Sequence, residues 1–534
     1  MKLLTAQRHR IPAVVAGAFV AFAVLAVVST YSVFSGAFDE PSHVAAGMEW
    51  LDRGQFTYEP MNPPLARVAV ALGPYLAGIR SFGSANRWRE GRNILYAEGA
   101  YRRNLALARL GVLPFFILAA AVVWLWTRRL FDAPTATAAV ALFATLPPVL
   151  AHSGLATTDF PVTATTFAAL YAFTLWLEER TMARSLWLGL AVGLAVLAKF
   201  SALIFLPAGG LAVLALWLPG RRRGTTTEAA ESDLGWSKAI PLALAAGGLV
   251  VWTGYRFSFG SGINGPPLPA PEFWRGLADL IDKQKVGHEA FLFGEISTTG
   301  WWYFFPVTLA VKTPIPFMLL TAVGTVTAAR AAIGEARTWR SLAPVAAALA
   351  VVLVTLPASL NIGLRHVLLA YPLAAVVAGH GAAHLWRSIR GRLAKRAAVG
   401  VLLIWQLAAT WRAHPDYLPW FNELAGREPD RILVNADLDW GQDLLRLADA
   451  VRARGIDSLA LAYYGSADPS QHLANVRPMA PFERPSGWFA VSVAVIKGLH
   501  VPDWTGFEWL ESVEPVAEIG KSIRLYNLTG EKRQ

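Results

Sequence analysis

Two adjacent carboxylates, Asp39 and Glu40, stand directly after the first long apolar run of the chain, at about residues 11–34. Charged side chains at a membrane boundary are costly to place and usually have a function. His43 follows three residues after Glu40, so a helix that starts at Pro41 would bring the three side chains close together. A carboxylate can accept a proton from a hydroxyl group, and carboxylates with an imidazole can also bind a divalent metal ion. Alternatively, Asp39 could cap a short helix beginning at Pro41.

Further unusual polar residues fall at the ends of later apolar runs. Asp159 begins one such run, and Lys199 lies in a very short turn between two runs. Lys312 lies at a depth in the membrane similar to that of Lys199, and Arg365 and His366 come together at the end of another run. Each has a simpler interpretation, since Asp159 could be a helix N-cap and Lys199 could extend its ammonium group to the interface. Taken together, carboxylates and cations at one membrane face suit a lipid whose phosphate lies at headgroup height.

The composition excludes an ordinary soluble protein. Of the 534 residues, 54% are hydrophobic and 16% are charged, and the mean hydropathy is +0.40. Such values are typical of a polytopic membrane protein. The chain has no cysteine, which excludes disulfides, thiolate metal sites and cysteine nucleophiles. The net charge of +11 is explained by basic loops that fix the orientation in the membrane, and we expect no nucleic-acid partner.

The apolar runs predict about 11 transmembrane helices. Arginine and lysine are concentrated in alternate loops, from the N-terminus to the loop at 387–396, whereas the other short loops hold little beyond Lys199 and Arg365. By the positive-inside rule the N-terminus is cytoplasmic and the C-terminus extracytoplasmic, in a multi-pass protein of the inner (plasma) membrane. The predicted runs are about 11–34, 105–126, 135–151, 159–177, 185–198, 201–218, 239–255, 314–329, 341–359, 366–385 and 397–412.

Two domains are expected, a membrane module at 1–413 with large external loops at 35–104 and 256–313, and an extracytoplasmic domain at 414–534. The second is long enough to bury its own core. Its apolar patterns predict a small α/β domain. The expected strands are 432–435, 459–464 and 488–495, and the expected helix is 440–454. The acidic motif Asp437-Leu-Asp-Trp-Gly-Gln-Asp443 could be part of a sugar-binding surface or a turn that caps the following helix.

Several short motifs, given below in the order of the chain, resemble those of the membrane glycosyltransferases of the GT-C superfamily. The chain is most similar to bacterial relatives of dolichyl-phosphate-mannose protein mannosyltransferases (glycosyltransferase family 39) and of the aminoarabinose transferase of lipid A. The motifs are Asp39-Glu40, Asn62-Pro-Pro-Leu-Ala-Arg67, Thr158-Asp159, Lys199-Phe-Ser, Phe293-Gly-Glu295 with Trp301-Trp-Tyr-Phe-Phe-Pro306, Lys312-Thr-Pro, Gly363-Leu-Arg-His366, and Tyr417-Leu-Pro-Trp-Phe-Asn-Glu-Leu-Ala-Gly426 followed by the acidic motif.

The resemblance implies a GT-C type membrane fold and an inverting transferase that uses a polyprenyl-phosphate sugar. On this resemblance Asp39 matches the catalytic base, with Glu40 beside it, and Asp159 matches the second acidic position. Asn62 stands where relatives often have His, and Arg67 where they often have Lys. The implied phosphate-binding residues are Lys199 and Arg365, then Lys312 and Arg256. The implied substrate-binding residues are His43, Asn62, Arg67, Glu295 and His366.

The resemblance leaves the sugar and the acceptor open, because lipid, glycan and protein acceptors all occur among relatives. We expect no required cofactor, although Asp39, Glu40 and His43 would suit a divalent metal. The alternative function is a transporter or flippase of lipid-linked sugars, which would place its polar site along the centre of the spans. Convergence of Asp39, Asp159 and Lys199 on one external cavity would favour the transferase. The tail is expected to assist acceptor binding without supplying catalytic groups.

Overall fold

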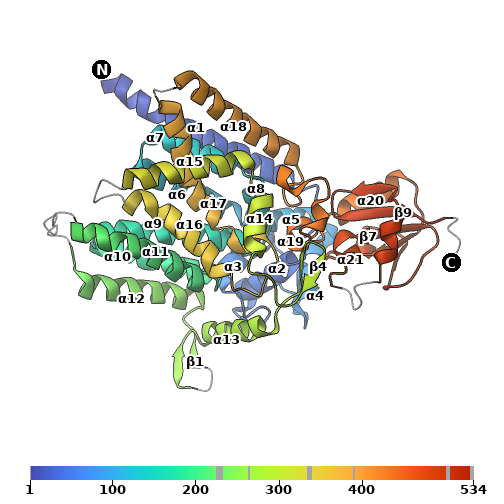
Figure 1. Cartoon of the computed structure of the whole chain (residues 1–534). Helices are drawn as coiled ribbons and strands as arrows, with labels where there is room; N and C mark the ends of the chain where they lie inside the picture. The colour runs from blue at the N-terminus through green and yellow to red at the C-terminus, as the bar shows by residue number, and fades with distance from the viewer. Residues whose placement is uncertain are drawn as a thin grey trace.

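A bundle of long apolar helices makes up most of the molecule, and a small sheet domain adjoins one of its ends (Figure 1). The computed structural model describes residues 2–223, 233–262, 265–332, 339–388, 391–500 and 506–529. Short helices and the hairpin of strands Ala290–Leu292 and Glu295–Ser297 lie between the bundle and the sheet domain, whereas the hairpin of strands Phe259–Ser261 and Pro267–Pro269 projects from the side of the bundle, below it in Figure 1. We call this end of the bundle, where residues 35–104 and 256–313 meet the tail at 414–529, the loop end.

Each of the predicted apolar runs falls on a helix or on a broken pair of helices. In the described part of the chain, seven helical segments are long and apolar enough to cross a membrane, and the pair α7 and α8, bent by 68°, would add an eighth. The polytopic fold is thus supported, while the count of 11 stays a prediction. The bundle consists of α1 (Lys2–Ser29), α5 (Tyr101–Leu110), α6 (Leu113–Leu130), α7 (Ala133–Ala144), α8 (Pro147–Ser153), α9 (Asp159–Glu178), α10 (Met182–Ala198), α11 (Ala202–Arg223), α12 (Trp236–Gly254), α15 (Ile315–Ala332), α16 (Trp339–Thr355), α17 (Ala370–Arg387) and α18 (Arg392–Ala413).

Small residues set the position of α10, the helix that ends at Lys199. Gly189 and Gly193 lie where α10 packs against α12, and a Cβ atom at Gly189 would come within 2.3 Å of the carbonyl oxygen of Ala243. Glycines spaced by four residues let two apolar helices approach closely. This packing brings the end of α10 to the loop end, next to the start of α9.

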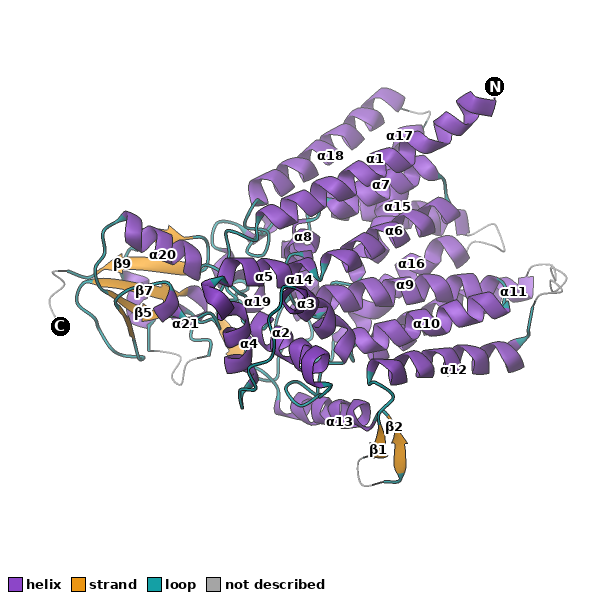
Figure 2. Ribbon diagram, turned by 180° about the vertical axis from the view of Figure 1, so that it is seen from behind, coloured by secondary structure: helices purple, strands orange, loops and turns teal. Residues whose placement is uncertain are grey.

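The loop end is built from short elements of three separate segments, which Figure 2 shows together between the bundle and the sheet. The segment before α5 carries the site residue Asp39 at the start of its first helix. Its elements are α2 (Glu40–Met48), the π-helix η1 (Glu49–Arg53), α3 (Pro64–Leu76), α4 (Arg87–Tyr96) and η2 (Ala97–Gly99). The others are β1 (Phe259–Ser261), β2 (Pro267–Pro269), α13 (Pro271–Val286), β3 (Ala290–Leu292), β4 (Glu295–Ser297), α14 (Phe304–Lys312) and η3 (Leu364–Val367).

The tail contains a mixed five-stranded sheet in the order β6-β5-β7-β9-β8. Strands β6, β5 and β7 are parallel, and β9 is antiparallel to both β7 and β8. The sheet strands are β5 (Leu459–Ala462), β6 (Val476–Pro478), β7 (Trp488–Ser492), β8 (Ala517–Ile519) and β9 (Ile523–Asn527). The tail helices are η4 (Glu423–Ala425), η5 (Pro429–Arg431), α19 (Asn435–Leu438), α20 (Leu444–Ala453), η6 (Pro469–Gln471), α21 (Val493–Ile496) and η7 (Glu508–Ser512).

Alternation along β5 gives the sheet two buried faces. Leu459 and Leu461 belong to the same apolar cluster as Leu447 of α20, whereas Ala460 and Ala462 pack in a second cluster with Phe507. Side chains of a strand point alternately to its two faces, so layers on both sides are needed to cover them. The tail thus buries apolar residues of its own.

In the tail, one predicted strand is absent, the predicted helix begins later than expected, and the strand predicted at 488–495 ends at Ser492, where α21 follows. Residues 432–435 form no strand, because the carbonyl of Val434 accepts hydrogen bonds from Asp437 and Leu438 in a turn that begins α19. The helix predicted from Trp440 begins only at Leu444, since Gly441 has a φ of +83° that interrupts a helix.

Candidate active site

A cavity of about 740 Å³ at the loop end brings together most of the predicted polar residues. Asp39, Asp159, Lys199 and Arg365 all line it, although they come from four different segments. Its other described walls include apolar side chains of the bundle, namely Val162, Ile204, Phe205, Val354, Leu368 and Leu369. We call it the bundle cavity.

Asp39 directly precedes α2 but does not cap it. Its side chain makes no hydrogen bond to the first turn of the helix, although Pro41 favours a helix start there. Instead, Oδ2 of Asp39 accepts a hydrogen bond of 2.6 Å from Nη1 of Arg365, and the carboxylate keeps 26% of its surface exposed. The capping interpretation of Asp39 is therefore wrong, and its carboxylate faces the cavity.

Asp159 begins α9 and is almost completely buried. Nζ of Lys199, the residue that follows α10, lies 2.6 Å from Oδ1 of Asp159, and Arg365 lies 3.7 Å from Oδ2. Oδ2 has no hydrogen-bond partner among the described residues. A buried carboxylate is stable only when paired, so the two cations explain how Asp159 stays charged there. Lys199 is directed at this carboxylate, and so the alternative that it extends freely to the interface is wrong.

Arg365 connects the two carboxylates from η3. Its guanidinium also lies over the ring of Trp440, at 4.4 Å from the centroid. His366, the next residue, lines the same cavity. Burial lowers the pKa of His366 well below its usual value, and the nearby charges of Lys199 and Arg365 lower it further. His366 is therefore neutral at pH 7 and contributes an uncharged imidazole.

Glu59, which the sequence interpretation missed, organises three predicted residues. Its Oε2 lies 2.9 Å from Nδ1 of His43, its Oε1 accepts a hydrogen bond of 3.0 Å from Asn62, and its backbone carbonyl accepts one of 2.8 Å from Arg67. Burial alone would raise the pKa of Glu59, but His43 and Arg67 together lower it to about 2. Glu59, His43 and Asn62 line the bundle cavity, whereas Arg67 is buried behind them. Glu59 lies three residues before the Asn62 motif, and this position is the feature of the sequence from which its role could have been predicted.

Glu40 does not reach the cavity. Its carboxylate is fully buried and pairs with Arg109, at 2.9 Å to Nε and 2.8 Å to Nη2. It also accepts hydrogen bonds of 2.7 Å from the backbone N–H groups of Ala37 and Ala156. All of its acceptor capacity is therefore used to join α2 to α5 and to the segment before α9. The prediction that Glu40 acts beside Asp39 in catalysis is corrected to a structural role.

Three further predicted residues lie outside the described cavities. Lys312 is buried and donates hydrogen bonds of 2.7 Å to the carbonyls of Leu418 and Asp437, which fixes the tail to α14. Arg256 donates to the carbonyl of Trp50 at 2.6 Å, and Glu295 is exposed at the start of β4. The predicted roles of Lys312 and Arg256 in phosphate binding, and of Glu295 in substrate binding, therefore have no geometric support.

The three residues that could have bound a metal ion together each pair with a different residue. Asp39 pairs with Arg365, Glu40 with Arg109, and His43 with Glu59. Among the residues that the structure describes, no group of three or more His, Asp and Glu side chains is arranged to hold a metal ion. A metal held jointly by Asp39, Glu40 and His43 therefore does not fit this arrangement.

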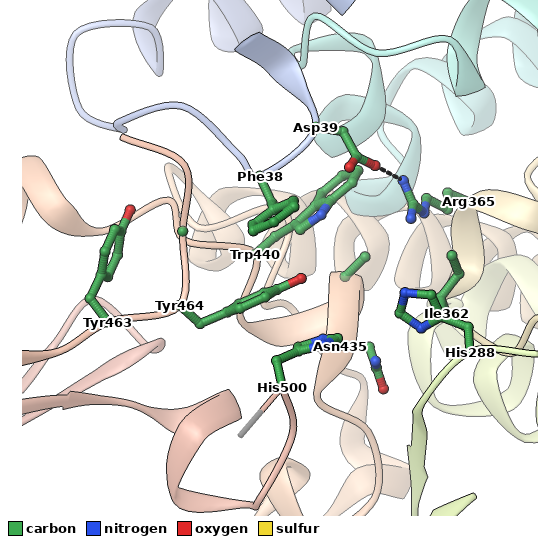
Figure 3. Close-up of a pocket in the computed structure, with 12 residues that line it drawn as sticks. Phe38, Asp39, His288, Ile362, Arg365, Asn435, Trp440, Tyr463, Tyr464 and His500 are labelled. Atoms are coloured by element: carbon green, nitrogen blue, oxygen red, sulfur yellow. Dashed lines mark hydrogen bonds and ion pairs between the residues drawn. The ribbon is translucent and has the colours of Figure 1, made fainter. Parts of the chain in front are cut away.

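A second cavity, of about 380 Å³, lies where the tail meets the bundle (Figure 3). It shares Phe38, Asp39, His288, Ile362 and Arg365 with the bundle cavity, and its other seven lining residues belong to the tail. We call it the tail cavity. The tail residues that line it are Asn435, Ala436, Trp440, Tyr463, Tyr464, Gly465 and His500.

The acidic motif of the tail positions Trp440 and presents no carboxylate to the cavity. Asp437 accepts a hydrogen bond from the backbone N–H of Leu364, and Asp439 accepts one from that of Ala494. Asp443 accepts a hydrogen bond from Ser522 and makes none that caps α20. Burial raises the pKa of Asp439 to about 7 and that of Asp443 to about 6. The interpretation of the motif as a helix cap is thus wrong, whereas the sugar-binding interpretation stays a prediction that rests on Trp440, which lines the tail cavity.

The comparisons with known proteins agree with this architecture. Residues 103–231 match the model of the family described as dolichyl-phosphate-mannose-protein mannosyltransferase, a range that includes Asp159 and Lys199. A search of curated proteins finds no match to the sequence.

Two solved structures are similar over nearly the whole chain. Both are crystal structures of ArnT from Cupriavidus metallidurans. The structure bound to undecaprenyl phosphate has a TM-score of 0.52 and 13% identity, with coverage of 96% of this chain and 98% of that chain. The structure in the apo state has a TM-score of 0.50 and 13% identity, with coverage of 95% and 97%. The chain therefore has the fold of the GT-C membrane glycosyltransferases, as its motifs indicated.

Proposed function

We propose that this protein is an inverting glycosyltransferase that moves a sugar from a polyprenyl-phosphate donor to an acceptor hydroxyl at the external membrane face. The observation that carries the proposal is the bundle cavity, in which Asp39, Asp159, Lys199 and Arg365 converge at one end of an apolar bundle. The clustering of these charges at the loop end, away from the middle of the bundle, favours transfer over transport.

The bundle cavity has both charged and apolar walls, and a polyprenyl-phosphate donor suits both. Lys199 and Arg365 offer an ammonium and a guanidinium group for the phosphate, and charge-assisted hydrogen bonds of this kind are strong. Apolar side chains of α9 and α11, such as Val162, Ile204 and Phe205, border the same space and suit the isoprenoid chain. The similar ArnT structure bound to undecaprenyl phosphate supports a polyprenyl-phosphate donor.

The proposed reaction needs one base and a stabilised leaving group. The acceptor oxygen attacks the anomeric carbon while the bond from that carbon to the phosphate oxygen breaks, and the phosphate leaves with the electron pair. Asp39 takes the proton of the acceptor hydroxyl, and Lys199 and Arg365 stabilise the charge on the departing phosphate. Attack on the face opposite the phosphate inverts the configuration. Asp159 holds both cations in place for this step.

The test is to incubate the purified full-length protein in lipid nanodiscs with a panel of polyprenyl-phosphate sugars and to follow sugar release and transfer by mass spectrometry. We expect slow hydrolysis of one donor without an acceptor, and faster transfer when membrane extract is added. Failure to cleave every donor, or movement of intact donor across the bilayer without cleavage, would reject the proposal. The orientation is tested separately with a reporter fused after Gln534, which should be active only outside the cytoplasm.

A further inference from the structure

The two cavities that meet at Asp39 differ in charge. Besides the shared ion pair, the bundle cavity is lined by four cations, Arg87, Lys199, Lys283 and Lys285, and by two carboxylates, Glu59 and Asp159. Apart from its histidines, the tail cavity has two charged residues among the 12 that line it, Asp39 and Arg365. These two neutralise each other through their 2.6 Å ion pair. The tail cavity is therefore polar but close to neutral, unlike the site proposed for the phosphate.

Tyr464 places an unused donor in the tail cavity. Its ring is stacked between those of Phe38 and His500, with centroids at 5.1 and 4.5 Å and planes within 9° in both cases. This stack fixes the ring, and the hydroxyl group has no hydrogen-bond partner among the described residues. Burial raises the pKa of Tyr464, and the charge of Asp39 raises it further, so the hydroxyl stays protonated and can donate.

His288 supplies a complementary acceptor on another wall of the tail cavity (Figure 3). Its Nδ1 lies 2.9 Å from the backbone carbonyl of Glu289. A carbonyl oxygen only accepts, so Nδ1 is the donor, and Nε2 is left as an acceptor in the neutral ring. Tyr464 and His288 thus place a hydroxyl group and an imidazole in a cavity that also contains Asp39, and His288 lines the bundle cavity as well.

We propose that the tail cavity binds the acceptor, and that the acceptor end that enters it is a neutral, hydroxyl-rich carbohydrate ring. A sugar hydroxyl both donates and accepts, so neighbouring hydroxyls can satisfy Tyr464 and His288 while another lies beside Asp39. An acceptor bearing a phosphate or carboxylate would meet no unpaired cation among the described lining residues and would lie close to Asp39. Burying such a charge without a partner is costly. This inference rests on the proposed function, because it assigns Asp39 as the base.

The assignment separates the two substrates by charge. The anionic donor occupies the cavity with the lysines, and the neutral acceptor occupies the cavity built by the tail. Asp39 faces both spaces, so the hydroxyl oxygen and the anomeric carbon can meet beside it. Reaction transfers the proton from the acceptor hydroxyl to Asp39 as the new glycosidic bond forms, and the phosphate remains with Lys199 and Arg365.

The experiment measures binding without turnover. The full-length protein in nanodiscs is titrated with neutral hexose and pentose trisaccharides, with trisaccharides of equal size that carry a phosphate or carboxylate, and with a serine-containing peptide, and saturation-transfer NMR reports binding. The unmodified protein is compared with Tyr464→Phe, which keeps the stacked ring and removes only the hydroxyl. Tyr526→Phe removes a tail hydroxyl that does not line the cavity and is the matched control.

We expect at least one neutral trisaccharide to bind, and its Kd to rise about tenfold in Tyr464→Phe, as loss of one good hydrogen bond implies, with no change in Tyr526→Phe. Preferred binding of the peptide or of a charged sugar, absence of binding by every neutral trisaccharide, or an unchanged Kd in Tyr464→Phe would each overturn the proposal. Donor hydrolysis is measured on the same samples. Trisaccharide binding without donor hydrolysis would reject the glycosyltransferase function, whereas hydrolysis without binding would reject only the acceptor assignment.

Discussion

The guanidinium of Arg365 lies 2.6 Å from the carboxylate of Asp39, at the point where the two cavities meet. Oδ2 of this carboxylate is occupied by the hydrogen bond that it accepts from Arg365. A donor phosphate would compete with Asp39 for Arg365 and leave the carboxylate free to accept a proton. On the proposed function, the pair would therefore couple donor binding to release of the base.

Replacement of Asp39 by Asn tests the base directly. The amide is nearly isosteric but cannot take the proton, so we expect kcat for transfer to fall by about 10²–10⁴ while the protein remains folded. Asp52→Asn is a suitable control, since Asp52 is equally exposed at 26% and lies outside both cavities. Turnover is measured by mass spectrometry of the product. Near-normal turnover in Asp39→Asn would remove Asp39 from the role of base.

Loss of the phosphate-binding cations should affect the donor more than the acceptor. We expect Lys199→Gln and Arg365→Gln each to raise the KM for the donor by about 10–100-fold, as loss of a charge-assisted hydrogen bond of about 1.5–3 kcal/mol implies. Arg256→Gln should leave this KM unchanged, because Arg256 contacts Trp50 outside both cavities. Initial rates at varied donor and acceptor concentrations separate the two KM values. A larger effect in Arg256→Gln would restore the original sequence prediction for that residue.

Glu40 should matter for stability. Glu40→Gln leaves Arg109 as a buried charge without its partner, which costs about 3–5 kcal/mol in comparable pairs. We expect a lower midpoint of thermal unfolding in detergent, together with near-normal kcat per folded molecule. The double variant Glu40→Gln, Arg109→Met should recover part of the stability, since no unpaired charge remains. A stable Glu40→Gln variant with a large loss of kcat would instead support the catalytic role.

The sequence was sufficient to predict that the charged residues gather at one end of the bundle, but not to separate structural from reactive carboxylates. Asp39, Asp159, Lys199 and Arg365 were recognisable because charges at the ends of apolar runs need a reason. Asp39 and Glu40 looked equivalent, yet successive residues at a helix start point about 100° apart, since a turn holds 3.6 residues. One therefore faces the cavity and the other the buried Arg109, a partner 69 residues away.

The fold was predictable where periodicity was long and not where it was short. Helices such as α1 and α9 follow from runs of about 20 apolar residues, whereas the four-residue run at 432–435 cannot be distinguished from a buried turn by pattern alone. Tyr464 escaped notice because its contacts come from distant segments, whereas Glu59, whose partners lie within 16 residues of it, was overlooked despite its position just before the Asn62 motif. Tyr464, for example, stacks on Phe38, more than 400 residues earlier in the chain.

The buried carboxylates of the acidic motif predict a pH dependence of stability. Burial raises the pKa of Asp439 to about 7 and of Asp443 to about 6, so between pH 4 and 7 the folded state binds more protons than the unfolded state. Their contribution is fully present below the unfolded pKa and is lost as the pH rises through 6 and 7.

We therefore expect the midpoint of thermal unfolding of the full chain to fall by at least about 2 °C between pH 5 and pH 8. The midpoint is followed by tryptophan fluorescence. Asp439→Asn should flatten this dependence, whereas Asp449→Asn, which alters an exposed carboxylate of α20, should not. A dependence that is equally steep in Asp439→Asn would show that other groups cause it.

The last prediction concerns Trp440, which the tail places under Arg365 at 4.4 Å. The tail thus contacts a residue that we propose binds the donor phosphate, which extends the original expectation that it assists only the acceptor. A cation over a tryptophan ring is stabilised by about 0.5–2 kcal/mol, so Trp440→Leu should lower kcat/KM for donor hydrolysis by roughly 2–30-fold. Trp440→Phe keeps an aromatic ring and should retain most of the activity. Trp509→Leu is the matched control, because Trp509 supports Arg484 in the same way outside both cavities. If Trp440→Leu lowered transfer but left donor hydrolysis unchanged, Trp440 would act on the acceptor alone, and Arg365 would not depend on the tail.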